Sequence, residues 1–233
     1  MRFFRKLNDL FVTKQNISFV TEALLGKQAC ISKDKYRELS DYAKEKNVKI
    51  SNFKRYTGDI NIIKTALDDI ASIALDFPRI LEGRRKLELN LDFYSSDDVF
   101  ATTVHHIIYI NASLYSSEEY LSSEYDLAVQ QGKFVKNTNY RSIIRHETGH
   151  VVANIYKINP MQVAKSILGL EYDYEVLNYI KNELSLYAAD FPDGREFISE
   201  SFSGYYSNVD NNFARLFVGK CKMLEGGCSD ETK

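Results

Sequence analysis

The sequence predicts an α+β protein in which a short twisted sheet rests on a long helix, preceded by a helical N-terminal segment. Apolar residues recur at helical spacing over residues 59–77 and again over residues 140–158. Between these stretches, residues 87–93 alternate apolar and polar side chains with period two, which is typical of a strand with one buried face. This order of helix, strands and helix differs from a regular βαβ alternation and favours the α+β class.

Composition limits the classes of protein to which the chain can belong. With 233 residues, 44% of them hydrophobic, it can bury one substantial core, or a main domain with a smaller appendage. Its 30 basic and 32 acidic residues nearly balance, so charge offers no reason to expect a nucleic-acid partner. The three scattered cysteines predict a reducing, cytoplasmic location, and we expect neither a signal peptide nor a membrane span.

The chain divides into three parts. Residues 2–25 carry apolar side chains at helical spacing, which we expect to pack on the core, with a membrane or another protein as the alternative partner. Ser32 can cap a second helix over residues 33–46. We therefore expect a helical N-terminal segment at residues 1–50, the main domain at residues 51–223 and a flexible tail at residues 224–233.

Helix and strand signals follow one another in the first half of the main domain. Asp59 is placed to cap a core helix that ends near Phe77. After the strand at residues 87–93 comes a polar stretch to Thr103, and then residues 105–111 predict a second strand at or near the edge of the sheet. Residues 113–136 predict a long excursion with a helical piece near residues 117–131.

The motif His146-Glu147-Thr148-Gly149-His150 lies on the helix predicted after residues 137–139 and before Pro160. Positions four apart share one face of a helix, so the two histidines can offer imidazole nitrogens to one ion. Glu147 stands between them and can reach a water bound to that ion. This is the geometry of a zinc hydrolase.

Catalytic zinc takes three protein ligands and keeps one position for water, so one ligand remains to be found. The metzincin continuation of the motif is excluded, because Ala153 and Tyr156 stand where glycine and histidine are required. His105 and His106 are adjacent on a predicted strand and point to opposite faces, so at most one of them can face the site. A downstream carboxylate is the expected third ligand.

Two downstream segments offer carboxylates four residues apart. Glu196 and Glu200 are preferred, because Gly194 marks the start of a helix whose apolar side chains pack it into the core. Glu196 is then the metal ligand, and Glu200 can accept a hydrogen bond from a ligand histidine and fix its tautomer. Glu171 or Glu175 remains an alternative ligand, and Glu196 can instead cap the start of its own helix.

The motif resembles a known family when it is combined with Leu186-Tyr187-Ala188-Ala189-Asp190 and Glu196-Phe197-Ile198-Ser199-Glu200-Ser201-Phe202. Over residues 140–206 the pattern is similar to the catalytic domain of anthrax lethal factor, a gluzincin-type zincin, and to metallopeptidase-like domains associated with phage head proteins. The resemblance implies a zincin-like domain at residues 51–223, whose edge strand can pair with an extended substrate. It also implies that Glu196 is the third zinc ligand and that Tyr187 assists catalysis.

The expected function is that of a zinc metalloendopeptidase of the HExxH…E type. It would bind Zn²⁺ and hydrolyse a protein or peptide substrate through a zinc-bound water, with Glu147 as general base and Tyr187 as donor to the oxyanion. The alternative is a phage head or assembly protein whose zinc-stabilised domain has little or no activity, with phage structural proteins as partners and a virion-associated location. A leaderless toxin would share the chemistry and differ in its target.

Overall fold

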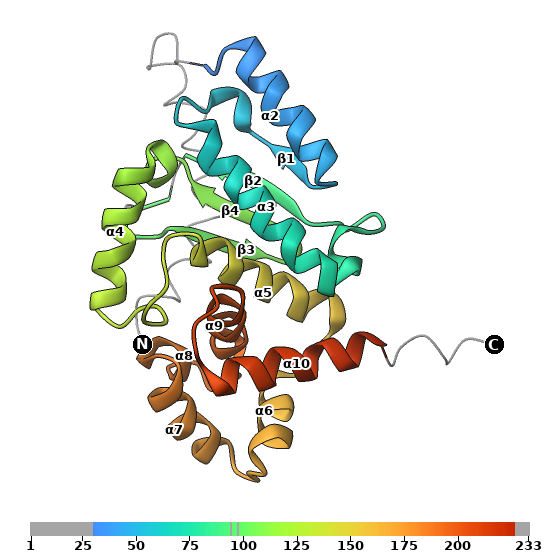
Figure 1. Cartoon of the computed structure of the whole chain (residues 1–233), viewed down its shortest axis with the longest axis vertical. Coiled ribbons are helices and arrows are strands. Elements are labelled where there is room, and N and C mark those ends of the chain that lie inside the picture. The colour runs from blue at the N-terminus through green and yellow to red at the C-terminus, as the bar shows by residue number, and fades with distance from the viewer. Residues whose placement is uncertain (1–29, 94, 97, 227–233) are drawn as a thin grey trace, which may run out of the picture.

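The computed structural model describes residues 30–93, 95, 96 and 98–226, and it shows an α+β protein with a small sheet among many helices (Figure 1). The helices are α2 (Lys33–Glu45), α3 (Ile60–Asp76), α4 (Glu118–Gln130), α5 (Ser142–Tyr156), α6 (Pro160–Leu168), α7 (Asp173–Glu183), α8 (Leu186–Ala189), α9 (Arg195–Tyr206) and α10 (Asn212–Gly226). The strands are β1 (Lys49–Ser51), β2 (Glu88–Asp92), β3 (Ala101–Val104) and β4 (Ile107–Asn111). The helix predicted within residues 2–25 lies outside the described residues.

The first two described helices begin at the predicted capping residues. The side chain of Ser32 accepts a hydrogen bond from the amide of Lys35, and that of Asp59 accepts one from Asn61. Their predicted extents are confirmed, because α2 ends at Glu45 and α3 at Asp76, directly before Phe77 and a proline.

The sheet has the strand order β1-β2-β4-β3. β1, β2 and β4 are parallel, whereas β3 runs antiparallel to β4. One face of the sheet is buried. On it, neighbouring residues of β2 and β4 form the pairs Leu89 with Ile108 and Leu91 with Ile110. The predicted alternation of residues 87–93 is confirmed by β2, whose apolar positions all lie on this face.

The edge of the sheet beside β4 is formed by a strand that the sequence does not predict. β4 is an inner strand, and the strand at the edge is β3, which lies in the stretch predicted to be polar and irregular. His105 and His106 form the turn between β3 and β4, with His105 in the left-handed region at φ 57°. The predicted strand at or near the edge, residues 105–111, corresponds to β4, which lies next to the edge strand. β3 is not predicted, because polar threonines pair with β4 where the sequence lacks apolar alternation.

Three helices lie side by side along the sheet (Figure 1). α5 packs against β3 and β4, α3 packs against α5, and α2 packs against α3 and β1. α9 covers the other side of α5 and is itself covered by α10. α5 is therefore buried between the sheet and α9.

Helices α6, α7 and α8 form an excursion between α5 and α9 (Figure 1). α6 contacts α10, and α8 contacts α9, so the excursion returns the chain to the side of α5. α10 continues to Gly226, past the point where a loose tail was predicted to begin, and residues 227–233 fall outside the described part. Across that described part, the helices are all too short or too polar to cross a lipid bilayer.

Candidate metal centre

α5 carries the motif, and the chain around it defines both of its ends. The side chain of Asn139 accepts a hydrogen bond from the amide of Arg141, just before the first turn. Lys157 adopts the left-handed conformation after the last turn and donates its amide to Ala153. Asn159 then caps α6, which begins at a proline.

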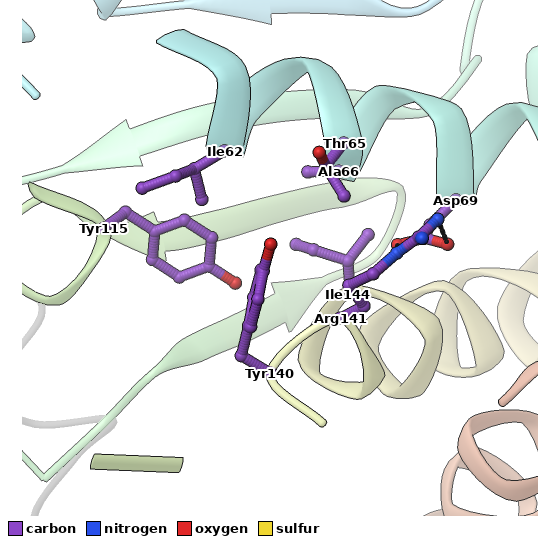
Figure 2. A pocket seen from close by; sticks show the side chains of 8 residues that line it. All are labelled: Ile62, Thr65, Ala66, Asp69, Tyr115, Tyr140, Arg141 and Ile144. Atoms are coloured by element: carbon purple, nitrogen blue, oxygen red, sulfur yellow. Dashed lines mark hydrogen bonds and ion pairs between the residues drawn. The ribbon is translucent and has the colours of Figure 1, made fainter. Parts of the chain in front are cut away.

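A buried ion-pair cluster fixes α5 against α3. The carboxylate of Asp69 lies 2.8 Å from Nη2 of Arg141 and 2.8 Å from Nη2 of Arg145, and Figure 2 shows the first of these pairs. Arg145 also donates to the hydroxyl of Ser207 at 2.9 Å, next to the end of α9. Because Arg145 directly precedes His146, the cluster fixes the rotation of α5 about its own axis and therefore the direction in which the two histidines point.

Sequence reasoning missed this cluster although a signal was present. Asp69 stands three residues after Ala66 and four before Ile73, on the buried face of an apolar helix. A carboxylate at such a position requires a cationic partner. The basic residue inside the apolar part of the motif helix, Arg145, is the matching signal.

A small pocket lies beside the ion-pair cluster, under α3 (Figure 2). Its lining includes Tyr115, Tyr140 and Ile62, and the hydroxyl of Tyr115 is buried without a hydrogen-bond partner. The pocket has room for no more than a water-sized molecule. Its lining does not include His146, His150 or Glu196.

Gly149 allows α5 and α9 to approach closely. A Cβ atom at Gly149 would lie 3.0 Å from Cα of Ser199 and 3.1 Å from Cβ of Phe202. No side chain larger than hydrogen fits there without movement of one helix. The contact brings the histidine face of α5 against the first two turns of α9.

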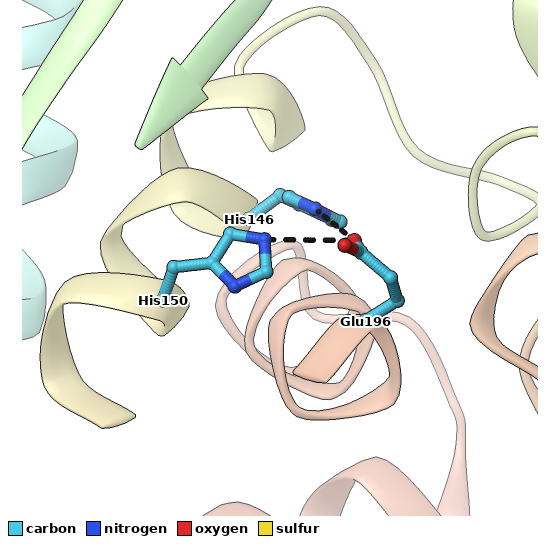
Figure 3. Close-up of side chains that lie close together, drawn as sticks. All are labelled: His146, His150 and Glu196. Atoms are coloured by element: carbon cyan, nitrogen blue, oxygen red, sulfur yellow. Dashed lines mark ion pairs between the residues drawn. The ribbon is translucent and has the colours of Figure 1, made fainter. Parts of the chain in front are cut away.

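Three side chains from these two helices converge, as Figure 3 shows. Oε2 of Glu196 lies 3.3 Å from Nε2 of His146 and 3.5 Å from Nε2 of His150. His146 and Glu196 are buried, and His150 is half-buried. Sequence reasoning selected these three residues as metal ligands, and the fold brings them together from α5 and α9.

The arrangement fits a tetrahedral metal ion. Bonds of about 2.0–2.1 Å at tetrahedral angles separate neighbouring ligand atoms by about 3.3–3.4 Å, close to the separations from Glu196 to the two imidazoles. Although buried, Oε2 of Glu196 accepts no hydrogen bond. A buried carboxylate oxygen without a donor is costly, and a cation shared with the two imidazoles removes that cost.

Glu200 orients one of the two imidazoles. It is fully buried one turn after Glu196, and its Oε1 lies 2.8 Å from Nδ1 of His146. This contact favours the tautomer with the proton on Nδ1 and turns Nε2 toward Glu196. The predicted contact between Glu200 and a histidine of the motif is present, and its support of a metal ligand stays a prediction.

The pKa values of the centre reflect its excess of carboxylates. Burial acts to lower the pKa of His146, but Glu196, Glu200 and Glu147 outweigh it and hold this pKa well above its ordinary value. Burial acts to raise the pKa of Glu196, but His146 and His150 outweigh it and hold this pKa well below its ordinary value. A metal ion at the centre therefore competes with a proton for His146.

Glu147, the predicted general base, has a partner that sequence reasoning missed. It is buried, and its Oε2 accepts a hydrogen bond of 2.6 Å from the hydroxyl of Thr103 on β3. The same hydroxyl lies 3.1 Å from the carbonyl oxygen of Glu147. No local sequence pattern around Thr103 predicts this contact, because the contact depends on how β3 lies across α5.

Tyr187 lies at the rim of the centre on the short helix α8. Its ring centroid is 6.5 Å from that of His146, and the ring centroid of Phe134 is 6.2 Å from the same imidazole. Burial raises the pKa of Tyr187, and the carboxylates of Glu196, Glu147 and Glu200 raise it further. Its phenol is therefore neutral and can donate a hydrogen bond.

The other sequence candidates lie away from the centre. Glu171 is exposed, and Glu175 accepts a hydrogen bond from the amide of Tyr172 at the start of α7. His105 is exposed in the hairpin turn, where its carbonyl accepts from Asn154, and His106 is half-buried beside it. The alternative in which Glu196 merely caps α9 is also not seen, since its carboxylate faces the two imidazoles.

Comparisons of the chain with models of protein families, with curated protein sequences and with solved structures give no match. The donor atoms of the centre are thus the basis on which its chemistry is assigned.

Proposed function

We propose that this chain is a zinc metalloendopeptidase of the HExxH…E type, with a zincin-like domain around the centre. The observation that carries the proposal is the convergence of the ligand atoms of His146, His150 and Glu196, with Glu147 between the two histidines on α5. Two imidazoles and one carboxylate are the donor set of hydrolytic zinc sites. Zn²⁺, when bound, supplies a Lewis acid that polarises the scissile carbonyl and lowers the pKa of water toward about 7.

The side chains around the centre then have distinct tasks. Glu147 takes a proton from the attacking water and delivers it to the leaving nitrogen as the peptide C–N bond breaks. Tyr187, kept neutral by its surroundings, donates a hydrogen bond to the oxyanion, a contribution typically worth about 3 kcal/mol. Glu200 keeps the ring of His146 in the orientation that directs Nε2 to the centre.

An extended peptide has a place to bind beside these groups. Among the described residues, β3 is one of the two edge strands of the sheet, and it packs directly against α5. An exposed edge offers main-chain donors and acceptors to a peptide that adds as a further strand. A substrate that pairs with β3 would therefore pass over the helix that carries Glu147.

The assembly-protein alternative predicts a different ligand set. A zinc site that only stabilises a fold closes with four protein ligands. In the described residues, the one cluster whose ligand atoms converge contains three, His146, His150 and Glu196, with a carboxylate of general-base type beside them. Three ligands and a base favour hydrolysis over a purely structural role.

Zinc content and cleavage, measured on the same variants, test the proposal. We expect one zinc per chain in the wild type and in Glu147→Gln, and loss of zinc in His146→Ala and Glu196→Ala. Fluorescein-labelled casein and a library of quenched fluorogenic peptides serve as substrates. Glu147→Gln should lose cleavage by at least about 100-fold, because it keeps the metal and lacks the base.

Glu171→Ala is the matched control, since it removes an exposed carboxylate that sequence reasoning also considered as a ligand. It should keep both zinc and cleavage. Cleavage by purified Glu147→Gln at the wild-type rate would refute the mechanism. Tight zinc binding without cleavage of any peptide in the library would favour the assembly protein.

A further inference from the structure

The register of β3 determines which of its main-chain groups face the open edge. Val104 and Ile107 close the two-residue turn of the β3–β4 hairpin and form a hydrogen-bonded pair. At the other end of the hairpin the amide of Asn111 donates to the carbonyl of Phe100 at 3.0 Å, so Phe100 and Asn111 are also a hydrogen-bonded pair. Because bonded and non-bonded pairs alternate in an antiparallel ladder, the N–H and C=O of Thr103 point away from β4, to the free edge.

The side chain of Thr103 points toward α5. Thr103 stands opposite Ile108, whose side chain is fully buried on the helix-covered face of the sheet. From that face its hydroxyl reaches Oε2 of Glu147 at 2.6 Å. The second acceptor, the carbonyl oxygen of Glu147, is more distant at 3.1 Å, so the single hydroxyl hydrogen serves mainly the carboxylate.

Thr103 thus contacts both the predicted peptide-binding edge and the predicted general base. Its main chain lies where a peptide strand would pair, and its side chain holds the carboxylate that would take the proton. A hydrogen bond to a buried carboxylate restricts the orientation of that carboxylate. With Oε2 held by Thr103, Oε1 of Glu147 is the oxygen left to face the attacking water.

We propose that Thr103 is a positioning residue, which aligns the general base Glu147 with the register of the bound peptide. This inference rests on the peptidase function proposed above. The main-chain contacts of residue 103 set where the scissile bond lies along β3, and its hydroxyl sets where the accepting oxygen of Glu147 lies. Loss of the hydroxyl should then slow the chemical step without weakening peptide binding.

Three substitutions on β3 test the inference on one fluorogenic peptide that the wild type cleaves. Thr103→Val removes the hydroxyl and keeps the β-branched shape, and it should lower kcat by about 10-fold with KM changed by less than about 2-fold. Thr103→Ser restores the hydroxyl and should stay within about 3-fold of the wild-type kcat. Thr102→Val is the matched control, because Thr102 pairs with Tyr109 on the opposite face, and it should leave both parameters unchanged.

The kinetic outcomes separate this inference from the proposed function. An unchanged kcat in Thr103→Val, in an active wild type, overturns the positioning role and leaves the peptidase proposal standing. A rise of KM with unchanged kcat also overturns it, since Thr103 would then serve binding alone. A zinc-loaded wild type that cleaves no peptide fails the proposed function and this inference together.

Thermal unfolding tests the contact itself without any substrate. Without zinc, the Thr103→Val protein should have a Tm about 3 °C or more below that of the wild type. In a Glu147→Ala background the same substitution should lower the Tm by clearly less, because the partner is already absent. Equal Tm shifts in the two backgrounds would mean that the hydroxyl does not hold Glu147, and would overturn the inference.

Discussion

Gly149 lies where α5 meets α9, and its replacement by alanine tests whether this close contact sets the geometry of the metal centre. The added Cβ would lie 3.0 Å from Cα of Ser199 and 3.1 Å from Cβ of Phe202, whereas ordinary contacts begin near 3.4 Å. One of these neighbours is main chain and the other is a Cβ atom bonded directly to it, so neither can rotate away. The two helices must therefore separate by a few tenths of an ångström.

Two opposing terms determine the cost. Overpacking of a buried contact typically costs about 1–3 kcal/mol, and alanine in a helix interior gains about 1 kcal/mol over glycine. Gly149→Ala should therefore lower the free energy of unfolding by about 1 kcal/mol, a Tm loss of about 2–4 °C in a chain of this size. Because metal–ligand distances tolerate shifts of only about 0.2 Å, zinc affinity should fall by about 10-fold or more.

Gly219→Ala is the matched control, since Gly219 also lies within a helix, α10, but a Cβ there meets nothing within 4 Å. It should raise the Tm by about 2 °C through helix propensity alone and leave zinc affinity unchanged. Differential scanning calorimetry and zinc titration of both variants provide the comparison. A Gly149→Ala protein that is as stable as Gly219→Ala and binds zinc as tightly as the wild type would refute the reasoning.

Other perturbations have equally defined outcomes. Asp69→Asn should lower the free energy of unfolding by about 3 kcal/mol in urea, because Arg145 stays buried without its counter-charge, whereas Asp41→Asn in an exposed ion pair should cost less than about 0.5 kcal/mol. Glu200→Gln should weaken zinc binding by about 10–100-fold in calorimetric titration. Because the pKa of His146 is raised in the metal-free protein, zinc binding displaces its proton, and affinity should rise by up to about 10-fold per pH unit until the pH exceeds that pKa. A loss of affinity with rising pH over that range would contradict this assignment. Zinc at about 100 times its Kd should add about 2.7 kcal/mol to stability and raise the Tm, and His146→Ala should abolish the rise.

Local signals explain the parts of the fold that sequence reasoning predicted. α2 and α3 follow from capping residues, Ser32 and Asp59, and from helical spacing of apolar side chains, which need no knowledge of the rest of the chain. β3 was missed because its threonines are only half-buried and its strand character comes from pairing with β4. The hairpin turn contains neither glycine nor asparagine, and His105 takes the left-handed conformation in their place.

The candidate centre shows the same division between local and long-range signals. The spacing of His146 and His150 predicts that they share a helix face, and the start of a helix near Gly194 predicts the placement of Glu196. The fold brings the three together, and their role as zinc ligands stays a prediction. Thr103 was beyond sequence reasoning, because its partner lies far along the chain and the contact depends on how the sheet crosses α5.

The excursion formed by α6 and α7 has a consequence for how a chain of this kind can diversify. The converging side chains all come from α5 and α9, so α6 and α7 contribute packing and connection but no donor atom to the cluster. The entropic cost of closing a loop grows slowly, by about 0.6 kcal/mol for each doubling of length. At Gly169, between α6 and α7, an added Cβ atom would meet nothing within 4 Å, so an inserted domain there would leave the donor atoms in place while adding a new surface to the molecule.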